Sequence, residues 1–274
     1  MLAFCFLLLA APPDTLPYDL ESPFFIINLA NEELREISGL GPTDSAGIYL
    51  SIADERGIIY FIDCNGGGKV RRTVCFRNKG DFEGVEMVGQ TLYAVKSDGD
   101  IFEITDWQRG KPEVQEYETA LDKEDDVEGL CYDQHRQALL VACKQNPDSM
   151  CLRRVFAFDL KAKTLSADPV YTIDPEEVNR IVPLGDDDKH RWFSPSGIAI
   201  HPITGDVYVI STSLKRLLVL DYRSGRIKFV AKLPKKMFPQ PEGIAFDLQG
   251  DLLISSEGKK GDGMVMKFEY KPLK

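Results

Sequence analysis

The sequence has little of several residue types on which common catalytic and metal sites depend. Three histidines, His135, His190 and His201, occur in 274 residues and lie far apart in the chain. The six cysteines form no Cys-x-x-Cys pair and no Cys/His spacing of a zinc site. Neither a Gly-x-Ser-x-Gly turn nor a phosphate-binding glycine loop is present. These absences argue against a zinc site and against a serine- or cysteine-type hydrolase.

Positive charge is outnumbered by negative charge, with 33 Lys and Arg against 43 Asp and Glu. The formal net charge is −10, and no segment gathers lysines and arginines into a basic patch. Nucleic-acid binding depends on such a patch, so we expect no nucleic-acid partner. The acidity suits a cation or a basic partner, or serves solubility alone.

One long apolar run is present, residues 1–11, followed by Pro12-Pro13. Eleven residues are too few to cross a bilayer but match the hydrophobic part of a signal peptide, although the usual positive charge before it is missing. A disordered hydrophobic end is the alternative, and lipidation of Cys5 stays open. We therefore expect residues 1–11 to direct export and residues 12–274 to form one domain.

A short pattern, Ser or Glu followed by Gly and an apolar residue, recurs five times. The copies are separated by 45, 45, 68 and 46 residues. A period of 40–50 residues is typical of β-propellers and of solenoids. The copies begin at Ser38, Glu83, Glu128, Ser196 and Glu242.

Short segments rich in Val, Ile, Tyr and Phe follow each copy, separated by turns that contain Gly, Pro, Asp or Asn. This is the pattern of strands, and no segment has a long apolar run of helical period. The third strands are expected at 58–62, 101–104, 155–158, 217–220 and 265–268, and the fourth strands at 70–76, 114–118, 170–173 and 227–232. Four antiparallel strands make one blade, so the sequence predicts an all-β protein, a five-bladed β-propeller.

The ends of the chain complete the same scheme. The last repeat has three strands, and the segment Pro23–Asn28 precedes Ser38 just as residues 227–232 precede Glu242. We expect this N-terminal strand to complete the last blade, because an open ring would leave strand edges exposed. A sixth blade within the 68-residue step is the alternative, but that step has one clear set of strands, which favours a long insertion.

Superposing the repeats predicts two polar rings at one mouth of the axial channel. The first ring is the residue before each glycine. Seven residues after the turn that joins the first and second strands comes a second hydrophilic set, which we expect beside the first ring. The first ring is Ser38, Glu83, Glu128, Ser196 and Glu242, and the second is Asp54, Lys96, Lys144, Thr212 and Glu257.

Five carboxylates and two lysines in this space imply raised pKa values, a bound cation, or pairing with the lysines. Oxygen donors suit Ca²⁺ or Mg²⁺, so Glu83, Glu128, Glu242 and Glu257 are candidate ligands of Ca²⁺. The acidic loops 122–126 and 186–188 are expected to overhang the same mouth, as are the loops 144–150 and 258–263. Alternatively, each ring residue only hydrogen-bonds to the backbone of the neighbouring blade.

The cysteines allow one disulfide. Cys143 and Cys151 flank a loop between two antiparallel strands, so a bond between them is plausible. Cys64 and Cys75 bound a hairpin, but its pairing would set Cys75 opposite Ile58 and away from Cys64.

The runs Glu36–Leu40, Phe82–Val85, Val127–Leu130, Ser194–Ile198 and Pro241–Ile244 resemble the SdiA-regulated family, also called the YjiK/CarP family, of bacterial exported β-propellers. The resemblance runs from about Tyr18 to Tyr270. It implies a periplasmic or membrane-associated protein of the bacterial cell envelope that is linked to calcium and is distantly similar to phytase-like propellers. It supplies no catalytic residue.

Three functions follow as hypotheses. The first is an exported binding protein that takes a divalent cation and a small anionic ligand or an envelope protein at the acidic mouth, with Ser38, Asp54, Lys96, Lys144, Ser196 and Thr212 around the ligand. The second is a Ca²⁺-dependent hydrolase, phytase-like or esterase/lactonase-like, in which Lys96 and Lys144 orient an anionic substrate. The third is a structural interaction module with an empty, wet channel.

Overall fold

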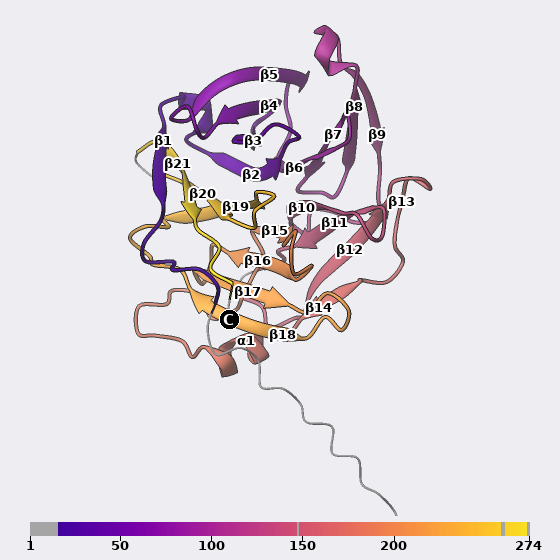
Figure 1. Ribbon diagram of the computed structural model, residues 1–274. Helices are drawn as coiled ribbons and strands as arrows, with labels where there is room; N and C mark the ends of the chain where they lie inside the picture. The colour runs from indigo at the N-terminus through magenta and orange to yellow at the C-terminus, as the bar shows by residue number, and fades with distance from the viewer. Residues whose placement is uncertain (1–15, 147, 259–260, 273–274) are drawn as a thin grey trace, which may run out of the picture.

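The computed structural model describes residues 16–146, 148–258 and 261–272. Five antiparallel sheets, four of four strands and one of five, lie around one axis, and each contains one copy of the repeated pattern (Figure 1). Blade one contains β2 (Ile37–Pro42), β3 (Ile48–Ala53), β4 (Arg56–Asp63) and β5 (Lys69–Arg77), and blade two contains β6 (Phe82–Val88), β7 (Thr91–Lys96), β8 (Ile101–Thr105) and β9 (Glu113–Tyr117). Blade three contains β10 (Val127–Asp133), β11 (Ala138–Cys143), β12 (Arg153–Asp159), β13 (Thr164–Leu165) and β14 (Tyr171–Ile173), and blade four contains β15 (Gly197–Ile200), β16 (Val207–Ser211), β17 (Arg216–Leu220) and β18 (Ile227–Lys232). Blade five contains β19 (Gln240–Phe246), β20 (Leu252–Glu257), β21 (Gly263–Phe268) and β1 (Phe25–Leu29).

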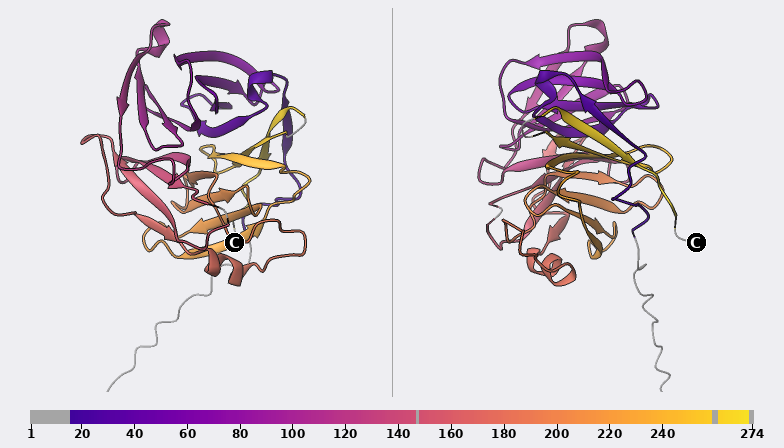
Figure 2. Two further views of the ribbon diagram at one scale, coloured as in Figure 1. Left: turned by 180° about the vertical axis from the view of Figure 1, so that it is seen from behind. Right: turned by 90° about the vertical axis from the view of Figure 1, so that its left-hand side faces the viewer.

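The N-terminal strand closes the ring as predicted. β1 pairs antiparallel with β21, with Ile27 opposite Val265. The indigo β1 lies next to the yellow β21 from each viewing direction (Figure 2). The five-bladed prediction is therefore confirmed, and the sixth blade is not formed in the described chain. We call the junction between blade five and blade one the seam.

The 68-residue step holds an insertion, also as predicted, but with a short helix that the sequence analysis missed. Helix α1 (Pro175–Ile181) follows β14 and begins at Asp174, whose side chain accepts a hydrogen bond from the Glu176 N–H at 2.9 Å. Two turns are too short to produce a detectable helical period. Two 3₁₀ turns, η1 (Glu32–Leu34) and η2 (Trp107–Arg109), complete the elements, and no described helix is long and apolar enough to cross a membrane.

The outer strand of blade three differs from the predicted single strand at 170–173. Two separate pieces, β13 and β14, both pair with β12. The chain leaves the sheet between them at Asp168-Pro169, because proline has no N–H to give to a sheet. The blade therefore keeps its outer edge, but in two segments.

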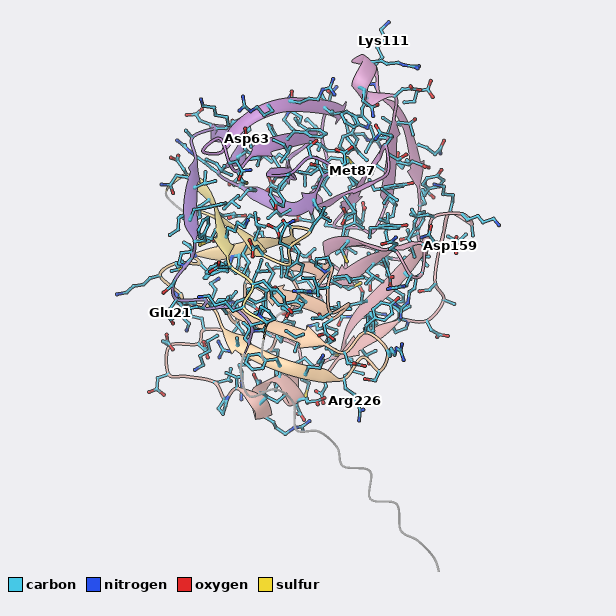
Figure 3. The ribbon with its side chains drawn as sticks, in the orientation of Figure 1. Glu21, Asp63, Met87, Lys111, Asp159 and Arg226 are labelled. Atoms are coloured by element: carbon cyan, nitrogen blue, oxygen red, sulfur yellow. The ribbon has the colours of Figure 1, made fainter. Side chains whose placement is uncertain are left out.

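Apolar side chains fill the spaces between blades. Strands β3, β7, β11, β16 and β20 are buried along most of their length, so each blade presents apolar side chains to both neighbours. Polar side chains project outward from the rim, where Lys111 lies at the outer tip of blade two and Met87 lies further in (Figure 3). The axis is therefore lined by the innermost strands alone.

The described cysteines are all free thiols. Cys143 is buried and Cys151 is exposed, so the plausible disulfide between them is not formed. Cys75 pairs with Ile58, as predicted from the hairpin.

Candidate functional site

The repeated Ser/Glu-Gly pattern lies where the innermost strands of neighbouring blades approach most closely. A Cβ atom on Gly84 would come within 2.6 Å of the Leu130 Cβ in the next blade. A Cβ atom on Gly243 would come within 2.6 Å of the Gly39 backbone carbonyl carbon. Glycine recurs because no larger residue fits between adjacent blades at this level. We call this end of the channel, at the amino ends of the five innermost strands, the acidic entrance.

The three glutamates of the first ring lie on β-bulges. In blade two the register passes from Phe82 directly to Gly84, which leaves Glu83 without a partner in β7. The registers of β10 and β19 skip Glu128 and Glu242 in the same way. In blade four, where serine replaces glutamate, β15 pairs with β16 without a bulge. Because a bulge redirects the side chain of the extra residue, these three carboxylates point away from the blade faces.

Glu83, Glu128 and Glu242 line one narrow cavity on the axis, with a volume of about 10 Å³. Burial, followed by the charges of Glu128, Asp81 and Glu242, raises the pKa of Glu83 to about 10. Burial and the charge of Glu128 raise the pKa of Glu242 well above its ordinary value. The pKa of Glu128 rises less, to about 7, because Lys144 opposes the effect of burial. The three groups therefore act as one electrostatically coupled cluster.

One of the two predicted lysines reaches this cluster. Lys144 forms a short ion pair with Glu128, and its Nζ lies 3.5 Å from Asp126 Oδ2. Lys96 instead pairs with Asp98 at 2.6 Å and with Asp100 at 3.3 Å. In the described chain, Glu83 and Glu242 therefore have no cationic side chain in contact.

Two predicted ring residues join blades. The Ser196 and Thr212 hydroxyls both donate to the Pro241 carbonyl of blade five, at 2.6 and 2.5 Å. Thr212 Oγ1 also lies 3.2 Å from Glu242 Oε1, and Ser196 Oγ accepts from the Thr212 N–H at 3.1 Å. Ser196 thus does what the backbone-bonding alternative expected, and Thr212 additionally holds the Glu242 carboxylate.

The remaining ring residues lie on the blade-one and blade-five side. Burial, with the charges of Asp54 and Glu36, raises the pKa of Glu257 to about 7. Burial also raises the pKa of Asp54. Ser38 is buried, and its carbonyl accepts a hydrogen bond from Ser51 Oγ at 3.3 Å. Glu36, which the ring superposition did not include, therefore contributes to the charge here.

The acidic loops are largely neutralised within the fold. Asp125 pairs with Arg154, and Asp188 lies 2.9 Å from Arg216 and 2.7 Å from Lys235. Arg216 is fully buried, which gives the 186–188 loop an internal anchor. Residues 147, 259 and 260, in two loops that were expected to overhang the entrance, lie outside the described residues.

The donor chemistry at the acidic entrance fits Ca²⁺, since carboxylate oxygens are its usual ligands. The arrangement is looser than a formed metal centre. Among the described residues, no three His, Cys, Asp or Glu side chains converge to hold one ion. Ligation by Glu83, Glu128, Glu242 and Glu257 would need these side chains to turn toward one point, with backbone carbonyls or water completing the shell.

Sequence reasoning missed the opposite end of the channel. There the carboxyl ends of the five innermost strands surround a wider cavity of about 340 Å³, which we call the axial hollow. Glu86 lines it and is buried, and its two oxygens accept from the Met87 and Tyr132 N–H groups at 2.9 and 3.0 Å. Burial raises its pKa to about 7. The signal was present in the sequence as a second glutamate, three residues after Glu83, among the apolar residues that end the strand.

A family model described as SdiA-regulated matches residues 27–260, which is most of the chain and every blade. The chain belongs to the SdiA-regulated family. No curated protein sequence matches this SdiA-regulated propeller.

Solved structures show the same fold at low sequence identity. Glutaminyl cyclase of Myxococcus xanthus has a TM-score of 0.63 and 12% identity, over 92% of this chain and 97% of that one. A luciferin-regenerating enzyme has a TM-score of 0.54 and 10% identity, over 90% and 95% of the two chains. The PQQ-bound aldose sugar dehydrogenase of Streptomyces coelicolor has a TM-score of 0.54 and 14% identity, over 90% and 97%. At these identities the likeness concerns the fold alone.

Proposed function

We propose that this SdiA-regulated propeller is a binding protein whose acidic entrance takes a divalent cation, Ca²⁺ in the first instance, together with a small anionic ligand or a partner protein. One observation carries the proposal. Glu83 and Glu242 are carboxylates in a confined space, burial and the charge of Glu128 raise the pKa of both, and no cationic side chain of the described residues contacts either of them.

Buried carboxylates of this kind have two stable states. They hold protons, or they share a cation. Lys144 supplies one positive charge, and Glu128 and Asp126 already balance that charge. A divalent cation would supply the missing charge for Glu83 and Glu242.

The size of the cavity limits what can enter. A volume of about 10 Å³ holds one water-sized particle. An ion fits, whereas an organic ligand would have to remain outside and contact the ion or Lys144 from the surface. This limit favours a binding role over a reaction within the channel.

The hydrolase hypothesis needs Lys96 and Lys144 to orient an anionic substrate. Lys96 forms ion pairs with Asp98 and Asp100. One of the two lysines that the hydrolase hypothesis requires for binding an anion is therefore engaged elsewhere. We therefore place the binding protein first. Export to the periplasm or to the cell envelope of a bacterium is part of the proposal, and the segment that would direct it, residues 1–11 with Cys5, lies outside the described residues.

Thermal unfolding of chelator-stripped protein tests the cation. A ligand that binds only the folded state raises the Tm by mass action, so millimolar Ca²⁺ should raise the Tm of the wild type. The Glu83→Gln/Glu242→Gln variant should lose that shift. Mg²⁺ should be measured in parallel, because it also prefers oxygen ligands.

A charge-matched control is the Glu21→Gln/Glu113→Gln variant, in which two exposed carboxylates are neutralised. It should keep the Ca²⁺ shift of the wild type. A wild-type Tm that does not change with Ca²⁺ or Mg²⁺ would contradict the cation proposal. A shift that both double variants keep would place the ion elsewhere on the molecule.

A further inference from the structure

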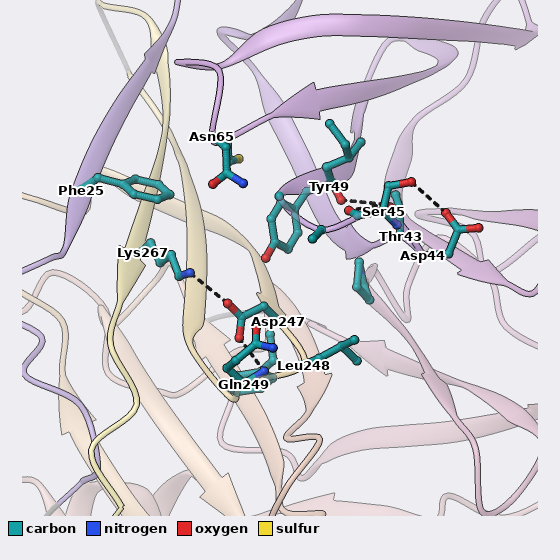
Figure 4. Close-up of a pocket in the computed structure, with 16 residues that line it drawn as sticks. Phe25, Thr43, Asp44, Ser45, Tyr49, Asn65, Asp247, Leu248, Gln249 and Lys267 are labelled. Carbon is teal, nitrogen blue, oxygen red and sulfur yellow. Dashed lines mark hydrogen bonds and ion pairs between the residues drawn. The ribbon is translucent and has the colours of Figure 1, made fainter.

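A second cavity lies at the seam, on the face opposite the acidic entrance. Its volume is about 230 Å³. Turns of blade one form one side, and the β19–β20 turn forms the other, together with Phe25 of β1 and Lys267 of β21 (Figure 4). We call it the seam pocket. It exists only because the N-terminal strand closes the ring, since Phe25 and Lys267 come from opposite ends of the chain.

Two of the charged groups that line the seam pocket, Lys267 and Asp247, pair with each other, whereas Asp44 is exposed and accepts a hydrogen bond from the Ser45 hydroxyl at 3.1 Å. Lys267 Nζ lies 2.9 Å from Asp247 Oδ2 and 2.9 Å from Asp251 Oδ2. Asp247 Oδ1 accepts from the Gln249 and Asp251 N–H groups at 3.0 and 2.9 Å, and Asp251 Oδ1 accepts from the Tyr270 N–H at 2.8 Å. An anionic ligand would meet the Asp44 and Asp247 carboxylates, and a cationic one would have to displace Lys267 to reach Asp247. The electrostatics therefore favour an uncharged ligand.

Polar groups at the pocket keep free hydrogen-bonding capacity. Tyr49 is 4% exposed, and its hydroxyl has no hydrogen bond within the described residues. Figure 4 shows this hydroxyl pointing toward Lys267 and Asp247, with Asn65 facing the same space. The ammonium of Lys267 has three protons and two carboxylate partners, which leaves one donor. Tyr49 as a whole is buried while its hydroxyl faces the pocket (Figure 4), where a ligand group or water completes its hydrogen bonding.

Two aromatic rings contribute to the apolar part of the lining, beside Pro42, Ala46, Ile48 and Leu248. Phe25 and Phe246 both line the pocket, and Phe246 is buried. An aromatic ring covers a flat apolar surface and attracts the C–H groups of a ligand that lies on it. The pocket thus combines an aromatic wall with groups that both donate and accept hydrogen bonds.

We propose that the seam pocket binds a small uncharged polyhydroxylated ring, of the size of one monosaccharide. Hydroxyl groups donate and accept at once, which matches Tyr49, Asn65 and the free donor of Lys267. The ring's C–H face would lie against Phe25. The volume is below the ~300 Å³ at which sites for drug-sized ligands begin, so a single ring fits and an oligosaccharide would extend out of the pocket.

Saturation-transfer difference NMR on the full chain tests this binding directly. The probes are glucose, galactose, mannose and myo-inositol, each measured with chelator present so that the acidic entrance plays no part. We expect difference signals from the ring C–H protons of at least one probe. This readout is preferable to a melting curve alone, because sugars also stabilise proteins by exclusion from their surface.

Two variants locate the site. Tyr49→Phe removes one unbonded hydroxyl, and Asn65→Ala removes an amide with no side-chain hydrogen bond among the described residues, so both should fold normally. Each should weaken binding about fivefold, the usual effect of one lost hydrogen bond. Tyr132→Phe is the matched control, because Tyr132 lines the axial hollow and not the seam pocket. Its signals should equal those of the wild type.

No difference signal from any of the four probes would overturn the proposal. Equal signals in the wild type, Tyr49→Phe and Asn65→Ala would place the sugar elsewhere and overturn the site. Acetate and ethylammonium serve as charged probes, and signals from these in place of the sugars would overturn the uncharged ligand. None of these results depends on whether the acidic entrance binds Ca²⁺.

Discussion

The two faces of the propeller divide charge and space between them. The acidic entrance gathers Glu83, Glu128 and Glu242 around a cavity of about 10 Å³. The opposite face has the axial hollow and the seam pocket, of about 340 and 230 Å³. Three carboxylates, Glu86, Asp133 and Asp247, line the hollow, and two of them are neutralised by Arg136 and Lys267. One face therefore has the charge for an ion, and the other has the room for a molecule.

The difference arises from the same innermost strands. At their amino ends, glycine lets adjacent blades approach, and bulges turn the glutamates inward. At their carboxyl ends, the same strands and the turns that follow them surround the axial hollow. Strand β6 contributes a glutamate to each end of the channel. Glu83 lies at the acidic entrance, and Glu86, three residues later, lines the axial hollow. The lesson is that a ring of charges identifies a site for an ion but does not identify the site of a larger ligand.

Breaking the seam should have the largest effect, because both faces depend on the closed ring. Leu29 of β1 is fully buried, so Leu29→Ala should lower the free energy of unfolding by about 3 kcal/mol. Ile26 lies on the same strand but is 50% exposed, and Ile26→Ala should change stability by less than about 0.5 kcal/mol. Urea unfolding measures both. Equal effects of the two changes would mean that β1 is not packed as described.

Removing the lysine of the acidic entrance should have the next largest effect. Lys144→Met leaves Glu128 buried without its cation, which should cost about 2 kcal/mol, less than a fully buried pair because Lys144 is partly exposed. Glu128→Gln in the same chain should recover part of the loss. Lys111→Met, at the outer tip of blade two, is the control and should have no effect (Figure 3). Urea unfolding at neutral pH, with chelator present, measures the free energy of unfolding of each variant. A Lys144→Met variant as stable as the wild type would refute the pairing of Lys144 with Glu128.

The two glutamates of β6 should titrate over different pH ranges. Both have folded-state pKa values above the ordinary 4.5, so the stability they contribute is fully present below pH 4.5 and falls as the pH rises. For Glu86 the fall should end near pH 7, and for Glu83 it should continue toward pH 10.

Urea unfolding from pH 4 to pH 9 in chelator measures this difference. Glu86→Gln should flatten the stability profile below about pH 7 only, whereas Glu83→Gln should also flatten it above pH 7. The slope removed by each change is at most about 1.4 kcal/mol per pH unit. Identical profiles for the two variants would show that the two ends of the channel do not differ electrostatically.

The smallest effect on stability should come from replacing Leu248, which lies between the axial hollow and the seam pocket. Leu248 lines both the axial hollow and the seam pocket and is 85% exposed. Leu248→Ser should change the free energy of unfolding by less than about 0.5 kcal/mol, because little packing is lost. A loss of more than 1 kcal/mol in urea unfolding would show that Leu248 covers the hollow in solution.

Much of the fold follows from the sequence, because a blade is a local structure. Alternating apolar residues and short turns predict each strand within a few residues, and β18 coincides with the predicted 227–232. The interrupted edge of blade three and helix α1 were missed, since a bend at Pro169 and a two-turn helix leave no periodic signal. The family resemblance drawn from the Ser/Glu-Gly copies was confirmed by the match over residues 27–260.

The candidate site was predictable in part. Counting from the repeats predicted Glu83, Glu128 and Glu242 around one mouth of the channel, and the three line one cavity there. It placed Lys96 with them as well, but Lys96 turns toward Asp98 and Asp100, its neighbours in the chain. The rotamer of a long side chain depends on which carboxylate is nearer, and the repeat does not specify this.

The sequence by itself thus determined the number of blades, the closure by the N-terminal strand and the identity of the entrance glutamates, because each follows from a pattern repeated along the chain. The tertiary structure decided which lysine pairs, where the bulges fall and where space remains. These depend on contacts between residues far apart in the chain, such as Phe25 and Lys267, which only the closed ring brings to one pocket.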